Sequence, residues 1–514
     1  MKSFFSFWKK SKEIVSDPTK SETEQKIPDG IKNNIDDNII AIREMFGESF
    51  DLIIKRSDIN SVKIAFVMLD GMYDNLLVSQ AVVQPILSTE FAAVEPKMIF
   101  DYMDKFRVSE CDSKDIITMD KAVEMLISGC MLFFVDGVSA CKSFSVQGYP
   151  KKSIDAPETE TQENGSHEGF ADMYKDNVTL LRRRLKNPYV RFETVTVGET
   201  SKTTVCMCYH AKRANPETVN NIKSKLKCID MDIVSGAGAL KPFFEGRKLS
   251  FFSSVGTTER PDVLAAKIAE GRIGMIVDGT PYALIVPYLF IENFHSLDDY
   301  LSRPYYTLVS RMLKIICFFL AVFLPGTYVA VGTFHQEIFP STVIYDIVSS
   351  LQNTPFPLVV ESLVIHFIYE IVREAGLRMP KTVGHAVSIV GALVIGDAAV
   401  TAGLISAPML IIVAVTAICS AVTSTLHQPS SILRLIFIIV GGTMGLFGIM
   451  LGLALVIVDL CSQSSFGVPF TSPFSPFDIY ASRDSIIFAG WKTVGKRFIK
   501  VNNLKGSDTD ASNS

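Results

Sequence analysis

Acidic side chains in an otherwise apolar part of the chain are the residues best suited to conduct or gate ions. Residues 312–458 hold only 11 of the 104 charged residues, and Glu361, Glu370 and Asp397 are among them. A carboxylate at the centre of a membrane costs ~2.5–3.5 kcal/mol on insertion scales unless it is paired or hydrated. Asp397 is therefore the first candidate for a pore or gating residue, and a buried structural hydrogen bond is the alternative.

The segment 355–372 predicts a helix that is polar on two opposite sides. Glu361 lies about 180° from Glu370 around such a helix, so neither polar side can face lipid. The helix could lie at the membrane interface, pack inside an oligomer or line a watery path, and these alternatives stay open. Pro355 and Pro357, at its start, join the two glutamates as candidate pore or gating residues.

Glycines in the last apolar segment, 432–458, recur at intervals of four, three and four residues. Gly441, Gly445, Gly448 and Gly452 would share one face of a helix and include two G-x-x-x-G steps. Small residues let helix backbones approach closely, which drives helix association in lipid. The pattern predicts tight packing, either within one subunit or between subunits.

Apolar stretches long enough to cross a membrane carry these residues. About 20 residues span the ~30 Å of hydrocarbon in a lipid bilayer. The candidate spans cover 312–331, 385–404, 408–426 and 432–458. Basic residues before the first stretch and near the C-terminus both favour the cytoplasmic side, so the number of crossings should be even. We expect four spans, with helix 355–372 amphipathic or re-entrant; the basic residues that follow this helix favour a fifth span there.

The N-terminal half has a different texture, with alternating helix and strand patterns in residues 31–150 and again in 170–300. The run Gly129-Cys-Met-Leu-Phe-Phe-Val-Asp-Gly137 returns as Gly271-Arg-Ile-Gly-Met-Ile-Val-Asp-Gly279, 142 residues later. Asp-Gly between two strand patterns is typical of a type I′ hairpin turn, so we interpret both aspartates as turn residues rather than catalytic ones. We expect two similar α/β subdomains.

The predicted fold class is therefore an α/β cytosolic region of two similar subdomains followed by an all-α polytopic membrane domain. Residues 1–30 are expected to be disordered, 151–169 to form a linker, 301–465 the membrane domain and 466–514 a cytosolic tail. The apolar run at the N-terminus is too short, and too soon followed by charge, for a signal peptide. We therefore expect the N-terminal region in the cytoplasm.

Composition and motifs argue against several classes of protein. A net charge of −4 does not fit a generic nucleic-acid binder, which would show a basic face. The nine cysteines are scattered, and no pair shows zinc spacing. No phosphate loop, dinucleotide fingerprint, His-Glu-x-x-His or nucleophile elbow occurs in the required structural context. We expect no enzymatic activity, no cofactor and no metal site.

Two charged motifs have a structural interpretation beside a functional one. In the first, Pro261 suits the opening turn of a helix and the following aspartate complements the helix dipole. In the second, Gly376 is expected to stop a helix at C′, with a proline just beyond. These motifs provide the candidates for inter-subunit contact or structural support, namely Glu259, Arg260, Asp262, Arg373, Glu374 and Arg378.

A series of motifs in order over roughly 165–480 is specific when taken together. It includes Thr258-Glu-Arg-Pro-Asp262, Ile276-Val-Asp-Gly-Thr-Pro-Tyr-Ala-Leu-Ile-Val-Pro287, Arg373-Glu-Ala-Gly-Leu-Arg-Met-Pro380, Val390-Gly-Ala-Leu-Val-Ile-Gly-Asp-Ala-Ala-Val400 and Ser465-Phe-Gly-Val-Pro-Phe470. The series resembles the A-subunit family of the bacterial spore germinant receptors. Ser406-Ala-Pro408 departs from the Ser-Pro usual in that family.

The resemblance implies an integral protein of the spore inner membrane that works with a transporter-like B subunit, which senses the nutrient, and a C-subunit lipoprotein. It also implies a ring-like homo-oligomer, a pentamer, acting as a ligand-gated ion channel in the lipid bilayer. An accessory paralogue encoded with the dipicolinate-channel genes shares the same layout. Alternatives of other classes are a membrane-anchored scaffold and a secondary transporter.

Overall fold

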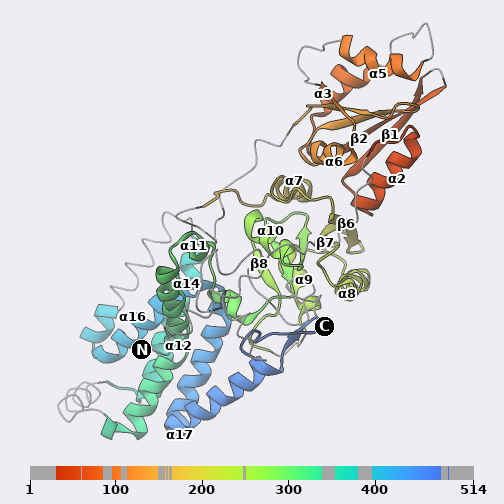
Figure 1. Cartoon of the computed structure of the whole chain (residues 1–514). Coiled ribbons are helices and arrows are strands. Elements are labelled where there is room, and N and C mark those ends of the chain that lie inside the picture. Colours follow the sequence, from red (N-terminus) through yellow and green to blue (C-terminus); the bar gives the residue numbers. More distant parts are fainter. Residues whose placement is uncertain are drawn as a thin grey trace, which may run out of the picture. The chain divides into compact units, whose positions relative to one another are not determined.

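The computed structural model describes two compact units (Figure 1). The first lies within residues 1–153 and 175–193, and the second within 154–174 and 194–514. The described residues are 30–59, 61–84, 95–105, 113–148, 157, 160, 162, 165–246, 250–338, 354–379, 396–475 and 484–485. The segment expected to be disordered, 1–30, lies outside this set except for Gly30, and so does most of the expected tail.

The first unit contains a five-stranded antiparallel sheet in the order β1-β2-β4-β5-β3. Its strands are β1 (Leu52–Ile59), β2 (Val62–Leu69), β3 (Ser113–Ile116), β4 (Met131–Val135) and β5 (Cys141–Phe144). Its helices are α2 (Ile35–Phe46), α3 (Asn75–Leu77), η1 (Val78–Val83), α5 (Pro96–Lys105) and α6 (Met119–Ile127). Helices α2 and α6 both pack on one face of this sheet.

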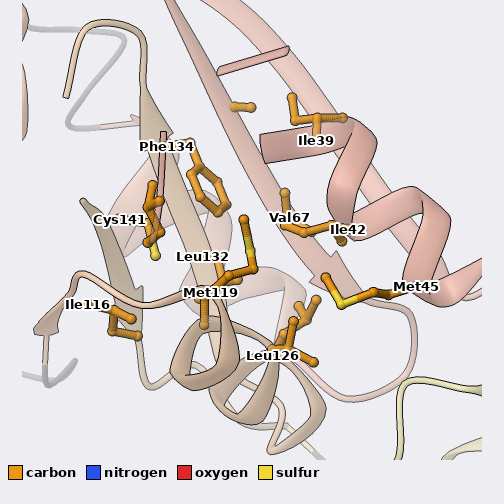
Figure 2. Packing of buried hydrophobic residues seen from close by; sticks show 14 of the residues in the cluster. Ile39, Ile42, Met45, Val67, Ile116, Met119, Leu126, Leu132, Phe134 and Cys141 are labelled. Atoms are coloured by element: carbon orange, nitrogen blue, oxygen red, sulfur yellow. The ribbon is translucent and has the colours of Figure 1, made fainter. Parts of the chain in front are cut away.

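Alternation along β2 explains how the sheet is covered on both faces. Successive side chains of a strand point to opposite faces. Ala65 and Val67 therefore join the core under α2 and α6, whereas Ile64 and Phe66 join a second core that includes α5. Figure 2 shows residues of the first core, with Ile39, Ile42 and Met45 of α2 facing the sheet.

The second sheet repeats the first, with the order β6-β7-β9-β10-β8. Its strands are β6 (Val190–Val197), β7 (Thr203–His210), β8 (Gly256–Thr258), β9 (Ile273–Val277) and β10 (Ala283–Val286). The helices of this subdomain are α8 (Pro216–Lys227), α9 (Ala237–Phe244), α10 (Pro261–Ala269), η2 (Phe290–Phe294) and α11 (Leu297–Leu301), and α7 (Tyr174–Arg184) precedes β6 in the chain. The identical strand order confirms the predicted pair of similar α/β subdomains.

The repeated Asp-Gly pairs have the same structural role in both subdomains. Asp136 Oδ1 accepts a hydrogen bond from the first backbone N–H of α2, at 3.1 Å, and Asp278 Oδ1 accepts one from the first N–H of α7, at 3.2 Å. Only the glycines, Gly137 and Gly279, have positive φ. A type I′ turn needs positive φ at both central residues, so the predicted type I′ turn is wrong. The connected strands are also too far apart in sequence for a two-residue hairpin.

A buried arginine explains why residues 175–193 belong to the first unit, although the sequence analysis assigned them to the second subdomain. Arg182 of α7 is fully buried, and its Nε donates to Asp51 Oδ2 at 2.7 Å. Its guanidinium also lies between the rings of Phe46 and Phe192. A buried charge needs such a partner, so α7 is fixed to the first sheet.

The second unit contains its own buried charge cluster, beside η2. Glu292 accepts hydrogen bonds from Arg272 at 2.5 Å and from Lys267 at 2.6 Å. Burial alone would raise the pKa of Glu292, but the positive charges of Arg272 and Lys267 outweigh it and lower the pKa to about 2. The carboxylate also accepts from the backbone N–H of Leu289, the N-cap residue of η2. Arg272, directly before β9, donates in turn to the carbonyl oxygen of Pro287, directly after β10.

Helices dominate the rest of the second unit. They are α12 (Pro304–Phe334), η3 (Gln336–Ile338), α14 (Leu358–Arg378), α16 (Ala407–Val422), η4 (Ser424–Leu426) and α17 (His427–Ser462), followed by β11 (Ser464–Ser465) and β12 (Val468–Pro469). Within the described residues, two helical segments are long and apolar enough to cross a membrane, Pro304–Phe334 and Ser424–Ser462. The expected span 385–404 lies mostly outside the described residues.

Helix α17 is bent, which corrects the prediction of one straight span over 432–458. Gly445 has φ 63° and ψ −153°, which no helical residue adopts. A Cβ on Gly452 would lie 2.6 Å from the ring of Phe437, although a straight helix would separate these residues by about 22 Å. The two segments of α17 therefore fold back on each other, and they meet near its label in Figure 1.

Both ends of α17 contact the second α/β subdomain. Just before its start, Thr425 Oγ1 donates to Asn293 O at 3.2 Å, and near its end Asp459 Oδ2 accepts from Ser250 Oγ at 2.9 Å. The Phe252, Phe290 and Phe318 rings pack together between the subdomain and α12. The helical region and the second subdomain thus share one core.

The first testable prediction concerns Glu292. Because its pKa is lowered in the folded protein, it stabilises the fold above its ordinary value of 4.5, and this stability is lost as the pH falls towards about 2. Glu292→Gln should lower the free energy of unfolding near pH 7 by about 3–5 kcal/mol, because Arg272 loses a buried partner. Urea unfolding of the full chain in detergent at several pH values measures both effects.

Glu44→Gln, on the exposed side of α2, is the control and should change stability by less than about 0.5 kcal/mol. Equal stability of Glu292→Gln and the native chain at neutral pH would contradict the assignment.

A second prediction follows from the crossing of α12 and α17. A Cβ on Gly441 would collide with the carbonyl oxygen of Gly326, whereas a Cβ on Gly238 of α9 would meet no atom within 4 Å. Gly441→Ala should therefore destabilise the chain by about 1–3 kcal/mol, and Gly238→Ala should stabilise it by up to about 1 kcal/mol. Thermal unfolding of both variants in detergent tests this, and similar midpoints would refute the close crossing.

Candidate functional site

Helix α14 has two chemically different sides. Its exposed side is apolar and is formed by Val360, Val364, Phe367 and Ile371 at helical spacing. The buried polar side chains of the opposite side are Glu361, Ser362 and His366. The helix packs lengthwise within the helical region, because a Cβ on Gly442 of α17 would meet Val359. The three predicted alternatives for this helix, a place at the membrane interface, inside an oligomer or along a watery path, stay predictions.

Glu361 is held by the N-terminus of α16. Its Oε1 accepts two hydrogen bonds from Ser406, one from the backbone N–H and one from the hydroxyl, both at 2.7 Å. Ser406 is the N-cap residue of α16, where the helix dipole favours a negative charge. Glu361 Oε2 is also buried, and within the described part of the chain it has no hydrogen-bond partner. The carboxylate therefore faces the interior of the same chain, with one oxygen satisfied.

Glu370 faces α17 from the other side of α14. Its carboxylate accepts a hydrogen bond from Ser431 Oγ and lies 3.8 Å from the guanidinium of Arg434. Arg434 is buried and lies over the ring of Tyr369. The contacts of the two glutamates agree with the 180° separation predicted from the sequence. Glu370 compensates a buried charge, so its evident role is structural.

Asp397 differs from the two glutamates because it is exposed on the surface of the single chain. It lies in a helical run that the structure describes from Gly396 onward, and apolar residues follow it. The predicted pore role of Asp397 and the alternative, a buried structural hydrogen bond, both stay predictions. Pro355 is exposed, and Pro357 is the N-cap residue of α14, so both prolines position the start of that helix.

The four glycines of α17 do not form one stripe on a straight helix, because the chain bends at Gly445. Gly441 lies against Gly326 of α12, and Gly452 lies against Phe437 of the first segment of α17. A Cβ on Gly448 would contact Val440, on the other side of the bend. These contacts favour the prediction of packing within one subunit.

The motif Glu259-Arg260-Pro261-Asp262 opens α10, as expected. Arg260 is buried, and its guanidinium donates to Asp262 at 2.7 Å and to the carbonyl oxygen of Ser166 at 2.7 Å. It also donates to the carbonyl oxygen of Glu160, whose carboxyl has its pKa raised to about 6 by burial. The arginine thus ties the expected linker to the second subdomain, and its contacts favour the structural interpretation.

The charged end of α14 corrects one prediction. Gly376 does not stop the helix, which continues to Arg378 before Met379 adopts an extended conformation. Glu374 accepts hydrogen bonds from Arg378 one turn later, a pair that stabilises the last turn. Residues before a proline avoid the helical region, and Pro380 follows in the sequence. Arg373 lies 3.7 Å from Glu370.

Several partners of the predicted residues were not identified from the sequence. Ser406 and Ser431 hold the two glutamates, yet single serines in apolar helices carry no distinctive pattern. The pairing of Glu370 could have been predicted from Arg434, because an arginine at the start of an apolar segment requires an acidic partner. Among the described residues, no group of three or more His, Cys, Asp or Glu side chains is placed to hold a metal ion.

Comparison with known proteins identifies relatives along most of the chain. The family model described as "Bacillus/Clostridium GerA spore germination protein" matches residues 40–498. "Spore germination protein KA" of Bacillus subtilis (strain 168) is 35% identical over 481 residues, covering 93% of this chain and 88% of its own. The "Uncharacterized membrane protein YfkQ" of the same organism is 36% identical over 395 residues, covering 76% and 77%.

A solved structure is also similar. The crystal structure of the N-terminal domain of the A subunit of the Bacillus megaterium spore germinant receptor GerK3 is 26% identical, covering 52% of this chain and 99% of its own, with a TM-score of 0.41. The relatives confirm the resemblance indicated by the sequence motifs. This chain belongs to the GerA family of spore germination proteins.

Proposed function

We propose that this chain is the A subunit of a nutrient germinant receptor in the inner membrane of a bacterial spore. In this proposal it assembles with a transporter-like B subunit, which senses the nutrient, and with a C-subunit lipoprotein. The family match over residues 40–498 supports a role in spore germination. The two long apolar segments, Pro304–Phe334 and Ser424–Ser462, support insertion in the membrane.

The proposed activity is that of a ligand-gated ion channel formed by a ring of copies, a pentamer by family resemblance. The observation that carries it is Asp397, an exposed carboxylate in a run of apolar residues. In a membrane such a side chain requires water or a polar partner outside its own chain. A ring of copies would bring several of these carboxylates around one aqueous path, and rings of Asp or Glu select cations.

The apolar side of α14 supports the same assembly. Phe367 and Ile371 are 65% and 52% exposed in the single chain. In a bilayer this side meets lipid or a neighbouring copy, because Glu361, Ser362 and His366 are buried. Glu374, near the end of the helix, is exposed and pairs with Arg378. Glu361 and Glu370 then support the subunit that carries the pore residue, and signals from the B subunit shift the ring between closed and open states.

The channel proposal predicts the effect of Asp397→Asn. Full-length chain, reconstituted in planar bilayers with its B and C subunits and activated by their nutrient, should conduct monovalent cations. Asp397→Asn should lower the cation conductance by roughly threefold or more and weaken selectivity over chloride. The physical reason is that a ring of carboxylates concentrates cations at the pore. Single-channel currents and reversal potentials in a salt gradient measure both effects.

Two matched variants separate the pore from the scaffold. Glu374→Gln removes an exposed carboxylate of α14, and Glu370→Gln removes the partner of Arg434; neither should change selectivity. No conductance from the native chain would favour the membrane scaffold. Equal selectivity of the native chain and Asp397→Asn would remove Asp397 from the pore.

A further inference from the structure

A cavity of about 450 Å³ lies beside α14, at the start of α16. Its walls are apolar, with Phe356 and Val364 from α14 and its approach, and Ala402 and Ile405 from the segment before α16. Glu361 is the one charged side chain among the described residues that line it. The volume falls within the range of small-molecule pockets, which combine apolar walls with few polar groups.

The two oxygens of Glu361 are in unequal environments. Oε1 receives both hydrogen bonds from Ser406, at the positive end of the α16 dipole. Oε2 is buried and has no hydrogen-bond partner among the residues that the structure describes, and the whole residue is only 1% exposed. Buried polar atoms without a partner are rare, and an unpaired carboxylate oxygen is among the most costly. The site therefore lacks one donor.

The chemistry of the walls selects the kind of donor. A bare metal cation would need several oxygen ligands, and Glu361 is the only carboxylate among the described lining residues. A zwitterionic amino acid would bring a carboxylate of its own for which these residues offer no positive charge. The site requires a donor for Oε2 and an apolar group that fills the cavity. A primary ammonium group on a short apolar body provides both, because its N–H groups pair with Oε2 and its chain fills the apolar space.

We propose that this cavity is a binding site for a primary ammonium carried on a short apolar body, with Glu361 Oε2 as the acceptor. The terminal torsion of a glutamate is soft, and in this proposal the carboxylate turns about it to present Oε2 to the cavity. Ser406 is the positioning residue, since it fixes the other oxygen. The site does not depend on the proposed channel, because binding is measured without conductance.

Equilibrium dialysis of radiolabelled n-hexylammonium against the full chain in phosphatidylcholine nanodiscs tests the proposal, with empty nanodiscs subtracted. We expect saturable binding of about one molecule per chain and no saturable binding of n-hexanol, which has the same body without the charge. Glu361→Gln should weaken binding at least about tenfold. Glu374→Gln, the same change at an exposed position of α14, should leave it unchanged within about twofold.

Ala402→Phe provides a second test that spares Glu361, because Ala402 is exposed and lines the cavity. It should also weaken binding at least about tenfold by filling the space. Phosphatidylethanolamine in the nanodiscs distinguishes the source of the ammonium: weaker hexylammonium binding would assign the site to a lipid headgroup. Equal binding of hexanol, or unchanged binding in Glu361→Gln or Ala402→Phe, would overturn the proposal.

Discussion

Polar side chains in an apolar helical region must find partners within the chain or open onto water, and this constraint arranges the second unit. Glu361 is held by the N-terminus of α16, and Glu370 is paired with Arg434 of α17. Because the two glutamates lie on opposite sides of α14, this one helix fixes two neighbours at once. Its remaining side is left apolar, as a surface in lipid or between copies requires.

Close backbone packing supplies the second constraint. At Gly326 and Gly441 the backbones of α12 and α17 lie so close that a side chain on either residue would collide with the other helix. The bend at Gly445 then returns the chain to the second subdomain, so that both ends of α17 are bonded to it through Asn293 and Ser250. In the proposed channel, a displacement of this subdomain would act on both segments of α17 through these hydrogen bonds.

The α/β half could be predicted well from the sequence because its signal is repeated. The run ending in Asp136-Gly137 returns at Asp278-Gly279, and the two sheets have the same strand order. The helical half could be predicted less completely from the sequence. The glycine pattern indicated close packing but not the positive φ of Gly445, since G-x-x-x-G looks the same in straight and bent helices. Ser406 and Ser431 depend on tertiary contacts that periodicity does not record.

The proposed channel depends on assembly, because Asp397 can line a pore only where several copies of the chain meet. Native mass spectrometry of the full chain, extracted in mild detergent over a range of concentrations, tests this most directly. The proposal predicts a closed ring, five copies by family resemblance, that persists on dilution. A chain that remains monomeric in every mild detergent and in nanodiscs would contradict it.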